Sequence, residues 1–341
     1  MPILNALIAA LAFGLSAPLS KLLLDVVSPL FLAGLLYLGA GLFLGLTRLV
    51  WRRPRSGRPL TPRDRGILTA LVLVGGVLAP PLLLWGLARS PATETALLLN
   101  LEVVFTALLA GPVFGEHLGP RVAIAAAVMA LGGIALGWTS KGPEITAAAG
   151  AVALACLFWA LDNNLTRLIA DRDPLLIVEV KGLVAGSVNT LLAILSGEPW
   201  PAPATVGLAM ALGAVSYGTS LVLFILAMRE LGAARAGAYF ATAPFFGAGG
   251  GHALCEPPTA NLLVAAALMA GATWLLVRER HSHRHRHEPS THSHRHVHDG
   301  HHQHEHGGGE GPEPHDHLHS TGPLEHEHPH TPDIHHDHGH R

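Results

Sequence analysis

Ten residues near the N-terminus, FGLSAPLSKL at Phe13–Leu22, align with the stretch WALDNNLTRL at Trp159–Leu168, 146 positions further along the chain. Ser28-Pro29-Leu30 then matches Asp173-Pro174-Leu175, and Gly115-Glu116 later falls opposite Cys255-Glu256. Each match is weak alone, but together they keep the same order, which indicates an internal repeat.

The amino-acid composition indicates whether this repeat belongs to a soluble or a membrane protein. Of the 341 residues 50% are hydrophobic and only 13% are charged, whereas soluble domains carry about 25% charged residues. This argues against a cytosolic enzyme, and the sequence contains no phosphate loop, nucleophile elbow or HExxH pattern. Two cysteines are too few for a disulfide framework or a Cys-rich zinc domain. We therefore expect a membrane protein that is not an enzyme.

Apolar runs set the expected number of membrane spans, because a helix needs about 20 mostly apolar residues to cross the hydrocarbon layer. Five spans per repeat is an odd number, so the second copy must insert upside down, as in many secondary transporters. The sequence predicts an all-α integral membrane protein, embedded in the lipid bilayer, with two inverted five-helix repeats at 1–139 and 147–277. The ten spans are expected near 3–23, 29–49, 66–88, 92–112, 120–138, 147–167, 175–196, 204–228, 233–251 and 259–277.

Arginine placement predicts the orientation, since cytoplasmic loops are enriched in Lys and Arg. Seven arginines lie in the loop 48–65, after the second span. The other even-numbered loops and the end of the last span hold Arg121, Arg167, Arg172, Arg229, Arg235, Arg278 and Arg280. Both termini are therefore expected in the cytoplasm. Arginine outnumbers lysine 19 to 3, which suggests a GC-rich bacterium and hence the bacterial inner membrane.

At this point the sequence resembles a known family. The run LNLEVVFTALL at Leu99–Leu109, followed by Gly115-Glu116 and Gly132-Gly133, is similar to the EamA domain, the repeat unit of the drug/metabolite transporter superfamily. The resemblance covers about residues 1–277 and implies a ten-helix carrier of small solutes that works by alternating access. It leaves the substrate open among amino acids, nucleosides, sugars, drugs and polyamines. The second copy departs from the pattern, with Ala243 opposite Glu102.

Polar residues within the spans are the candidate site, because a charge at membrane depth usually lines a cavity or has a partner. The densest cluster is Asp162-Asn163-Asn164. One hypothesis is a solute or proton site around Asp162; the other is a hydrogen-bond network between helices, or an Asp162 ion pair with Lys181. Three consecutive polar residues cannot all face one neighbouring helix, which favours the first hypothesis.

Four further residues complete the set of candidates. Glu179 and Lys181 are two positions apart, point about 200° apart on a helix and so need separate partners; a place at the membrane interface is equally compatible. Glu102, with Asn100 beside it in the fourth span, is the second candidate for proton coupling, since a lone carboxyl there must be protonated or paired.

Proline and glycine mark where the spans depart from simple helices. Pro18, Pro80-Pro81, Pro112 and Pro244 lie within or at the ends of spans. Such breaks either free backbone carbonyls toward a cavity or are ordinary kinks. Gly75-Gly76 is expected to allow close helix packing.

The C-terminal segment 281–341 differs sharply from the rest, with 22 of the 24 histidines and almost no apolar residues. It cannot bury a core, so we expect a disordered cytoplasmic tail. Neutral imidazole suits Zn, Cu, Ni and Co ions. The first blocks of metal-binding candidates are His281, His283, His285, His287, His292, His294, His296, His298, His301, His302, His304 and His306.

These features predict a secondary active transporter, an exporter of small organic metabolites, coupled to protons through Asp162 or Glu102 and needing no cofactor for transport. The tail would then act as a metal sensor or buffer. Alternatively, the cargo is Ni, Co or Zn and the tail collects it, or the protein is a membrane-tethered metal store without transport. No nucleic-acid partner is expected, and a homodimer is left open.

Overall fold

The computed structural model describes residues 2–50, 59–114, 120–139, 142–143, 145–231, 233–254 and 256–277, and four tail segments at 282–287, 290–296, 315–321 and 324–329. The chain divides into a helical unit within residues 1–279 and a second unit at 280–330. Each unit is described by itself below.

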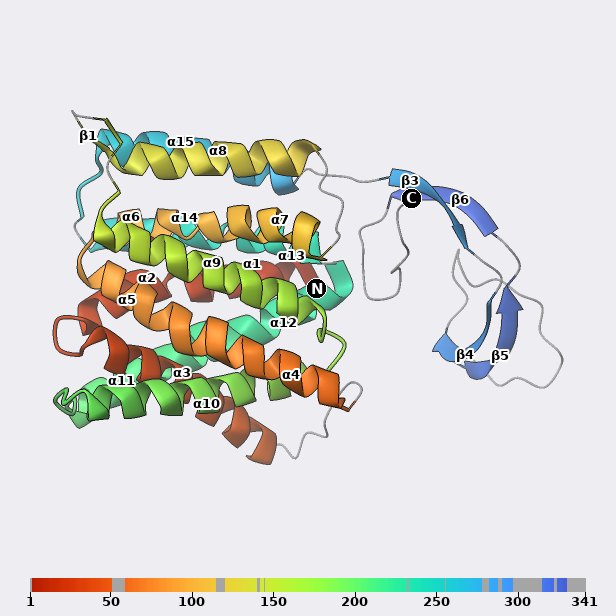
Figure 1. Cartoon of the computed structure of the whole chain (residues 1–341), viewed down its shortest axis with the longest axis horizontal. Coiled ribbons are helices and arrows are strands. Elements are labelled where there is room, and N and C mark those ends of the chain that lie inside the picture. The colour runs from red at the N-terminus through yellow and green to blue at the C-terminus, as the bar shows by residue number, and fades with distance from the viewer. Residues whose placement is uncertain are drawn as a thin grey trace. The chain divides into compact units, whose positions relative to one another are not determined.

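The helical unit is a bundle whose helices run side by side (Figure 1). Two short strands, β1 (Trp138–Thr139) and β2 (Gly142–Pro143), pair between its two halves. The helices of the first half are α1 (Pro2–Gly14), α2 (Ser16–Leu23), α3 (Pro29–Val50), α4 (Pro62–Leu71), α5 (Ala79–Ala88), α6 (Ala92–Leu98), α7 (Leu101–Phe114) and α8 (Pro120–Leu136). Those of the second half are α9 (Ala147–Arg167), α10 (Pro174–Leu195), α11 (Pro203–Gly213), α12 (Ser220–Leu231), α13 (Ala233–Phe240), α14 (Ala243–Ala253) and α15 (Ala260–Val277).

Among the described residues, eight helical stretches are long and apolar enough to cross a membrane. They coincide with the first four expected spans, the sixth to the eighth, and the tenth. The fifth expected span is the shorter apolar helix α8. The ninth is divided between α13 and α14, each of which is shorter than a full span. The count of ten spans, and the inversion of the repeats, stay predictions.

Two spans contain a wider π-helical turn near their middle. The stretch η1 (Val72–Leu78) joins α4 to α5, and η2 (Ala214–Thr219) joins α11 to α12. Pro80 and Pro81 lie in the first turn of α5, one residue after η1 ends. A proline lacks the N–H that would bond the carbonyl four residues earlier. The Gly76 carbonyl is freed in this way and accepts a hydrogen bond from Asn189 Nδ2 at 3.1 Å. This carbonyl bonds to the neighbouring helix α10 and does not line the cavity, so both interpretations of the proline pair stay open.

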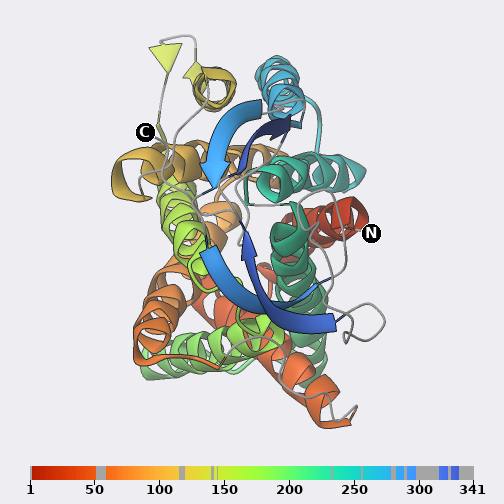
Figure 2. The same cartoon turned by 90° about the vertical axis from the view of Figure 1, so that its right-hand side faces the viewer.

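Glycines allow the closest helix contacts. A Cβ added at Gly41 of α3 would lie 2.5 Å from the Leu183 nitrogen of α10, and one at Gly186 of α10 would lie 2.5 Å from the Leu38 nitrogen of α3. A Cβ at Gly76 would lie 2.6 Å from the Ala185 Cβ, so the expected packing role of Gly75-Gly76 is confirmed. Figure 2 looks along the bundle and shows these helices close together.

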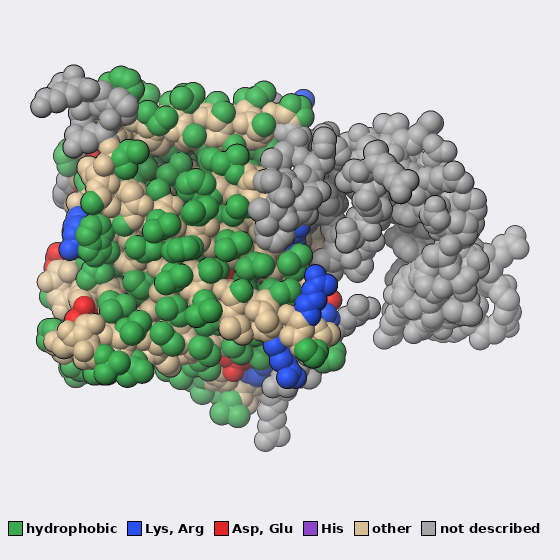
Figure 3. All heavy atoms as spheres, viewed as in Figure 1, with side chains coloured by type: hydrophobic (Ala, Val, Ile, Leu, Met, Phe, Trp, Pro, Cys, Tyr) green, Lys and Arg blue, Asp and Glu red, His purple; other side chains and the backbone are tan. Residues whose placement is uncertain are grey.

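Apolar side chains cover the flank of the bundle, and charged ones gather at its ends (Figure 3). Exposed Leu42, Leu191 and Leu263 are examples on three different helices. A contiguous apolar surface of this size indicates contact with lipid. Together with the eight candidate spans, it makes the protein a multi-pass integral membrane protein.

Ion pairs and caps tie the helices together at both ends. At the end where α4 begins, Arg48 pairs with Asp173 at 3.2 Å, and Arg172 pairs with Asp64 at 3.0 Å. At the other end, the Lys21 ammonium donates to three backbone carbonyls, those of Leu87 and Ala88 in the last turn of α5 and of Ser90 after it. There Glu256, in the loop before α15, accepts hydrogen bonds from the backbone N–H groups of Ala92 and Thr93, at 2.7 and 2.8 Å.

The second unit contains four strands, β3 (Ser282–His287), β4 (Ser290–His296), β5 (His315–Thr321) and β6 (Leu324–Pro329). Strand β3 pairs with β6, and β4 pairs with β5, both antiparallel. The disordered tail predicted from the sequence at 281–341 stays a prediction.

Candidate functional site

A polar cluster surrounds a small cavity inside the helical unit. Two acidic side chains, one lysine and one asparagine lie among aromatic and aliphatic groups. The cavity is lined by Phe13, Tyr37, Glu102, Trp159, Asp162, Asn163, Lys181, Tyr217, Leu221, Phe224 and Phe240. These residues come from both sequence repeats, so the cavity lies where the two halves of the chain meet.

An ion pair between α9 and α10 is the main electrostatic feature of this site. Lys181 Nζ lies 2.5 Å from Asp162 Oδ2, and each side chain is only 7% exposed. The other carboxylate oxygen, Asp162 Oδ1, has no hydrogen-bond partner among the described residues. Buried polar atoms are usually satisfied, so this oxygen is an acceptor available to a ligand or a proton.

A second carboxyl group lies beside the ion pair. Asn163 Nδ2 donates to Glu102 Oε1 at 2.6 Å, which joins α9 to the first turn of α7. Glu102 follows the break between α6 and α7, where Asn100 Nδ2 donates to the Leu97 carbonyl. The helix break therefore helps to bring this carboxyl group to the cavity.

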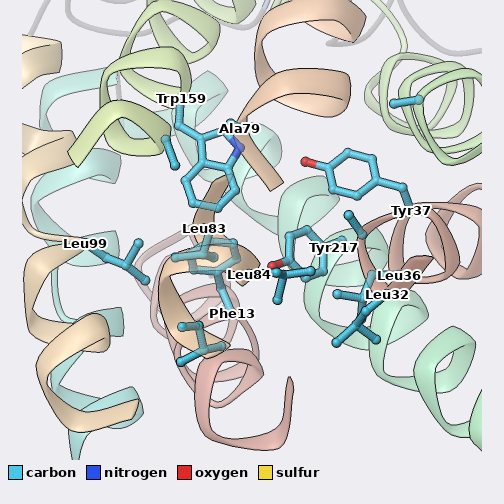
Figure 4. Packing of buried hydrophobic residues seen from close by; sticks show 14 of the residues in the cluster. Phe13, Leu32, Leu36, Tyr37, Ala79, Leu83, Leu84, Leu99, Trp159 and Tyr217 are labelled. Atoms are coloured by element: carbon cyan, nitrogen blue, oxygen red, sulfur yellow. The ribbon is translucent and has the colours of Figure 1, made fainter. Parts of the chain in front are cut away.

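Glycine at position 75 lets the ion pair approach η1. A Cβ there would lie 2.3 Å from the Asp162 Cγ atom, closer than any real contact. The Gly75 carbonyl accepts two hydrogen bonds, from the Tyr37 hydroxyl at 2.8 Å and from the Trp159 indole at 3.0 Å. These two hydrogen bonds fix the orientation of both rings, and Figure 4 shows the Tyr37 hydroxyl pointing toward the Trp159 ring.

Aromatic rings close the cavity on the side of α1. Phe13 makes edge contacts with Trp159 and Tyr217, with ring centroids 5.8 and 5.6 Å apart, and a tilted contact with Phe240 at 5.3 Å. The remaining cavity measures about 20 Å³, roughly the space of one water molecule. A solute larger than water therefore fits here only if the surrounding helices move apart.

The structure brings together four of the seven candidate residues, Glu102, Asp162, Asn163 and Lys181. Three lie outside the cavity lining. Asn164 donates to the Ala160 and Thr106 carbonyls, Asn100 also contacts the Met269 sulfur, and Glu179 pairs with Arg48 at 3.4 Å. As expected, Glu179 and Lys181 have separate partners.

The aromatic lining was missed by the sequence analysis. Phe, Tyr and Trp in a span look like ordinary apolar residues, so composition gave no signal. One signal was present: Phe13 and Trp159 are the first residues of the two aligned stretches, and their rings touch. Inverted-repeat carriers place their solute site where the two halves meet, so a contact between matching residues of the two stretches is a signal for the site.

Metal-binding candidates are confined to the tail. Among the described side chains, no group of three or more His, Cys, Asp and Glu residues is placed to hold a metal ion. Six of the twelve candidate histidines belong to strands β3 and β4. The other six, which lie outside the described residues, are His281, His298, His301, His302, His304 and His306.

Comparison with known proteins identifies the family. The profile of the EamA-like transporter family matches residues 1–138 and again residues 146–278. The chain belongs to the EamA-like transporter family. Its two matched segments coincide closely with the repeats at 1–139 and 147–277. It is thus a membrane transporter built from two EamA domains.

Two relatives agree with this assignment. The chain is 30% identical over 262 residues to a Methanothermobacter thermautotrophicus protein described as an uncharacterized transporter, covering 72% of this chain and 76% of that protein. A solved crystal structure superposes with a TM-score of 0.60 at 20% identity, covering 81% of this chain and 97% of the other. The latter similarity concerns the fold alone.

Proposed function

We propose that this EamA transporter is a secondary active exporter of small organic solutes, coupled to protons at the Asp162–Lys181 pair. The observation that carries the proposal is the buried ion pair whose second carboxylate oxygen has no partner among the described residues and lies beside a small cavity. Ionisable groups at membrane depth typically mark solute pathways or proton relays. The proposal includes no enzymatic activity.

The ion pair provides a way to couple proton and solute. A proton on Asp162 neutralises the carboxylate and releases the Lys181 ammonium, so protonation and the ion pair exclude each other. A solute with its own charged group competes for the same partners, and Glu102 supplies a second acidic group close by. The aromatic rings stack on organic groups and attract cations. This combination suits a small organic ion.

The proposed architecture is ten spans in two inverted repeats, with both termini in the cytoplasm of a bacterial cell and the chain in its inner membrane. The double family match, the matching π-helical stretches of η1 and η2 and the Phe13–Trp159 contact all support the repeat. The seven arginines of the loop 48–65 support the orientation. Homodimer formation stays an open proposal, with the bilayer as surroundings and no nucleic acid.

The tail is proposed to bind divalent Zn, Ni, Co or Cu as a sensor or buffer, apart from transport. The alternative is a metal exporter whose tail collects the cargo. The residues that line the described cavity include no imidazole or thiol, and the Lys181 ammonium would repel a bare cation. Transition ions prefer nitrogen and sulfur donors, so the cavity favours an organic cargo. A membrane-tethered metal store is the third proposal.

The test compares four forms of the protein: the full chain, a chain ending at Arg280, Asp162→Asn, and Glu179→Gln as the matched control. Glu179 is an ion-paired acid outside the cavity lining. Inside-out vesicles are supplied with labelled amino acids, amines and organic acids under a proton gradient. Cells carrying each form are also challenged with Ni, Co, Zn and Cu, and their metal content is measured.

We expect a member of this panel to accumulate in vesicles with every form except Asp162→Asn. Cellular metal content should rise with the tail, whatever stands at position 162. If instead the full chain lowers one metal and Asp162→Asn abolishes that effect, the cargo is the metal. If Asp162→Asn changes neither transport nor metal content, and no solute accumulates, the protein is a store.

A further inference from the structure

A second cavity, which shares no lining residue with the one beside the Asp162–Lys181 pair, lies at the end of the helical unit where α5 ends and α6 begins. It measures about 430 Å³, within the range of pockets that hold small molecules. Its walls are the end of α2, the turn between α5 and α6, the first turn of α6, and the loop before α15. We call it the end cavity.

Four ionisable side chains line the end cavity, and three of them already have partners. An ammonium group has three N–H donors, and those of Lys21 bond to three backbone carbonyls at the end of α5. Both carboxylate oxygens of Glu256 accept backbone N–H groups at the start of α6. The Arg89 guanidinium lies 4.0 Å above the centre of the Trp85 ring and donates to the Trp85 carbonyl at 3.0 Å.

Glu94 is the fourth ionisable group, and it differs from the other three. It stands in the first turn of α6 and is half-buried. Among the described residues, none donates a hydrogen bond to its carboxylate or forms an ion pair with it. A carboxylate that is partly removed from water loses part of its hydration unless a partner replaces it. The end cavity therefore offers one negative charge that is free to bind a cation.

The walls of the end cavity are held in place without Glu94. Lys21 fixes the end of α5 from the side of α2, and Glu256 fixes the start of α6 from the side of α15. Helix α14 packs tightly here as well, since a Cβ added at Gly251 would lie 2.8 Å from the Thr93 Cγ2 atom. A cavity whose walls are fixed in advance loses little entropy when a ligand binds.

We propose that the end cavity is a binding site for a small organic solute with an ammonium group, which pairs with Glu94. Apolar side chains such as Pro257 and Leu262 supply contacts for the rest of the solute. Arg89 is exposed at the rim, where water and salt screen its charge.

The position of the end cavity gives such a site a place in transport. In the proposed orientation this end faces away from the cytoplasm, because α3 ends and α4 begins at the opposite end. The site then holds cargo on its way out of the cell. This role rests on the proposed function, whereas binding of the amine does not.

The test measures binding of radiolabelled phenethylamine to the full chain, purified in detergent, by equilibrium dialysis. We expect Glu94→Gln to weaken binding about tenfold, because a hydrogen bond to a charged group is lost. Since Glu94 has no partner to lose, this variant should melt at the same temperature as the natural chain. The matched control is Asp25→Asn, an exposed acid in the turn after α2 and outside the cavity lining, and it should bind normally.

Two competitors test which charge is recognised. Phenethyl alcohol has nearly the same shape as the amine but no charge, and it should compete about tenfold less well. Phenylpropionate carries a negative charge and should compete no better than the alcohol. If phenylpropionate competes best, the cationic groups recognise the ligand and the proposal is wrong. It is also wrong if the natural chain shows no saturable amine binding, or if Glu94→Gln binds the amine as tightly.

A further variant separates the end cavity from the one beside the ion pair. Asp162→Asn with Lys181→Met removes both charges there and should bind phenethylamine as the natural chain does. Loss of binding in this double variant would place the amine at the ion pair instead.

Binding at the end cavity and transport can fail separately. Transport in vesicles, together with unchanged amine binding by Glu94→Gln, would leave the proposed function standing and overturn this site. Amine binding that depends on Glu94, in a chain that transports no solute, would support the site and overturn the proposed function.

Discussion

Removing both members of the Asp162–Lys181 pair should disturb folding less than removing either one. Asp162→Asn leaves a buried ammonium without its partner, and Lys181→Met leaves a buried carboxylate. Breaking a buried ion pair by removing one partner costs about 3–5 kcal/mol. We therefore expect each single substitution to lower the free energy of unfolding by about 3 kcal/mol.

In the double variant, the lost attraction between the two charges is offset by the desolvation cost that is no longer incurred. At 2.5 Å and an effective permittivity of about 20, the attraction of the pair is about 7 kcal/mol. Moving two ions out of water costs several kcal/mol each, which offsets most of that attraction. The double variant should therefore lose less than about 1 kcal/mol relative to the natural chain.

Unfolding in mixed detergent micelles, followed by tryptophan fluorescence, measures these differences. Glu179→Gln is the control: its partner Arg48 is 17% exposed and Glu179 itself 19% exposed, so the loss should stay below about 1 kcal/mol. The double variant should be folded but unable to transport. If it is both stable and fully active, the pair is only structural and the proposed coupling is wrong.

Three further substitutions test other features. Gly75→Ala should abolish transport, because its methyl group would displace the ion-paired carboxylate of Asp162. Gly66→Ala is the control and should transport normally, because a Cβ there meets nothing within 4 Å. Equal transport by both variants would refute the close approach of Asp162 to Gly75. Asn189→Leu leaves the Gly76 carbonyl of η1 without its side-chain donor and should cost about 1–3 kcal/mol in the same unfolding assay. A loss near zero would mean that another group satisfies this carbonyl. Burial acts to raise the pKa of Glu256, but the two backbone N–H groups that it caps outweigh this and lower the pKa. Its stabilisation should be complete above about pH 5 and lost as the pH falls through the lowered pKa; Glu256→Gln should remove this acid sensitivity, and an unchanged melting temperature profile between pH 5 and 3 would contradict it.

The long spans were the predictable part of the fold, because they depend on apolar run length and on prolines and charges at the ends. The expected span near 29–49, for example, is the helix α3 (Pro29–Val50). The ninth expected span was predicted less well. Its apolar composition does not indicate that the helix breaks around position 241 into α13 and α14. There the helix ends at Phe240 and a new one begins at Ala243.

The site was predicted only in part, because a sequence does not give the rotation of a helix about its axis. Asp162, Asn163 and Asn164 point about 100° apart in turn, and only the first two line the cavity. Asn164 instead bonds to backbone carbonyls. The partner of Asp162 was among the alternatives, whereas nothing in the sequence assigned Tyr37 to the carbonyl of Gly75.

The wide turns η1 and η2 each hold a spare residue within a membrane span. If such a turn tightens to α-helical geometry, the half of the span beyond it rotates by about 100°, one residue's turn. In η1 this rotation would carry α4 around relative to α5, and with it the packing partner of Asp162 at Gly75. The Gly75 and Gly76 carbonyls of this turn accept hydrogen bonds from side chains of α3, α9 and α10. A rearrangement inside this one span would therefore change hydrogen bonds to three other helices at the same time, without any hinge between domains.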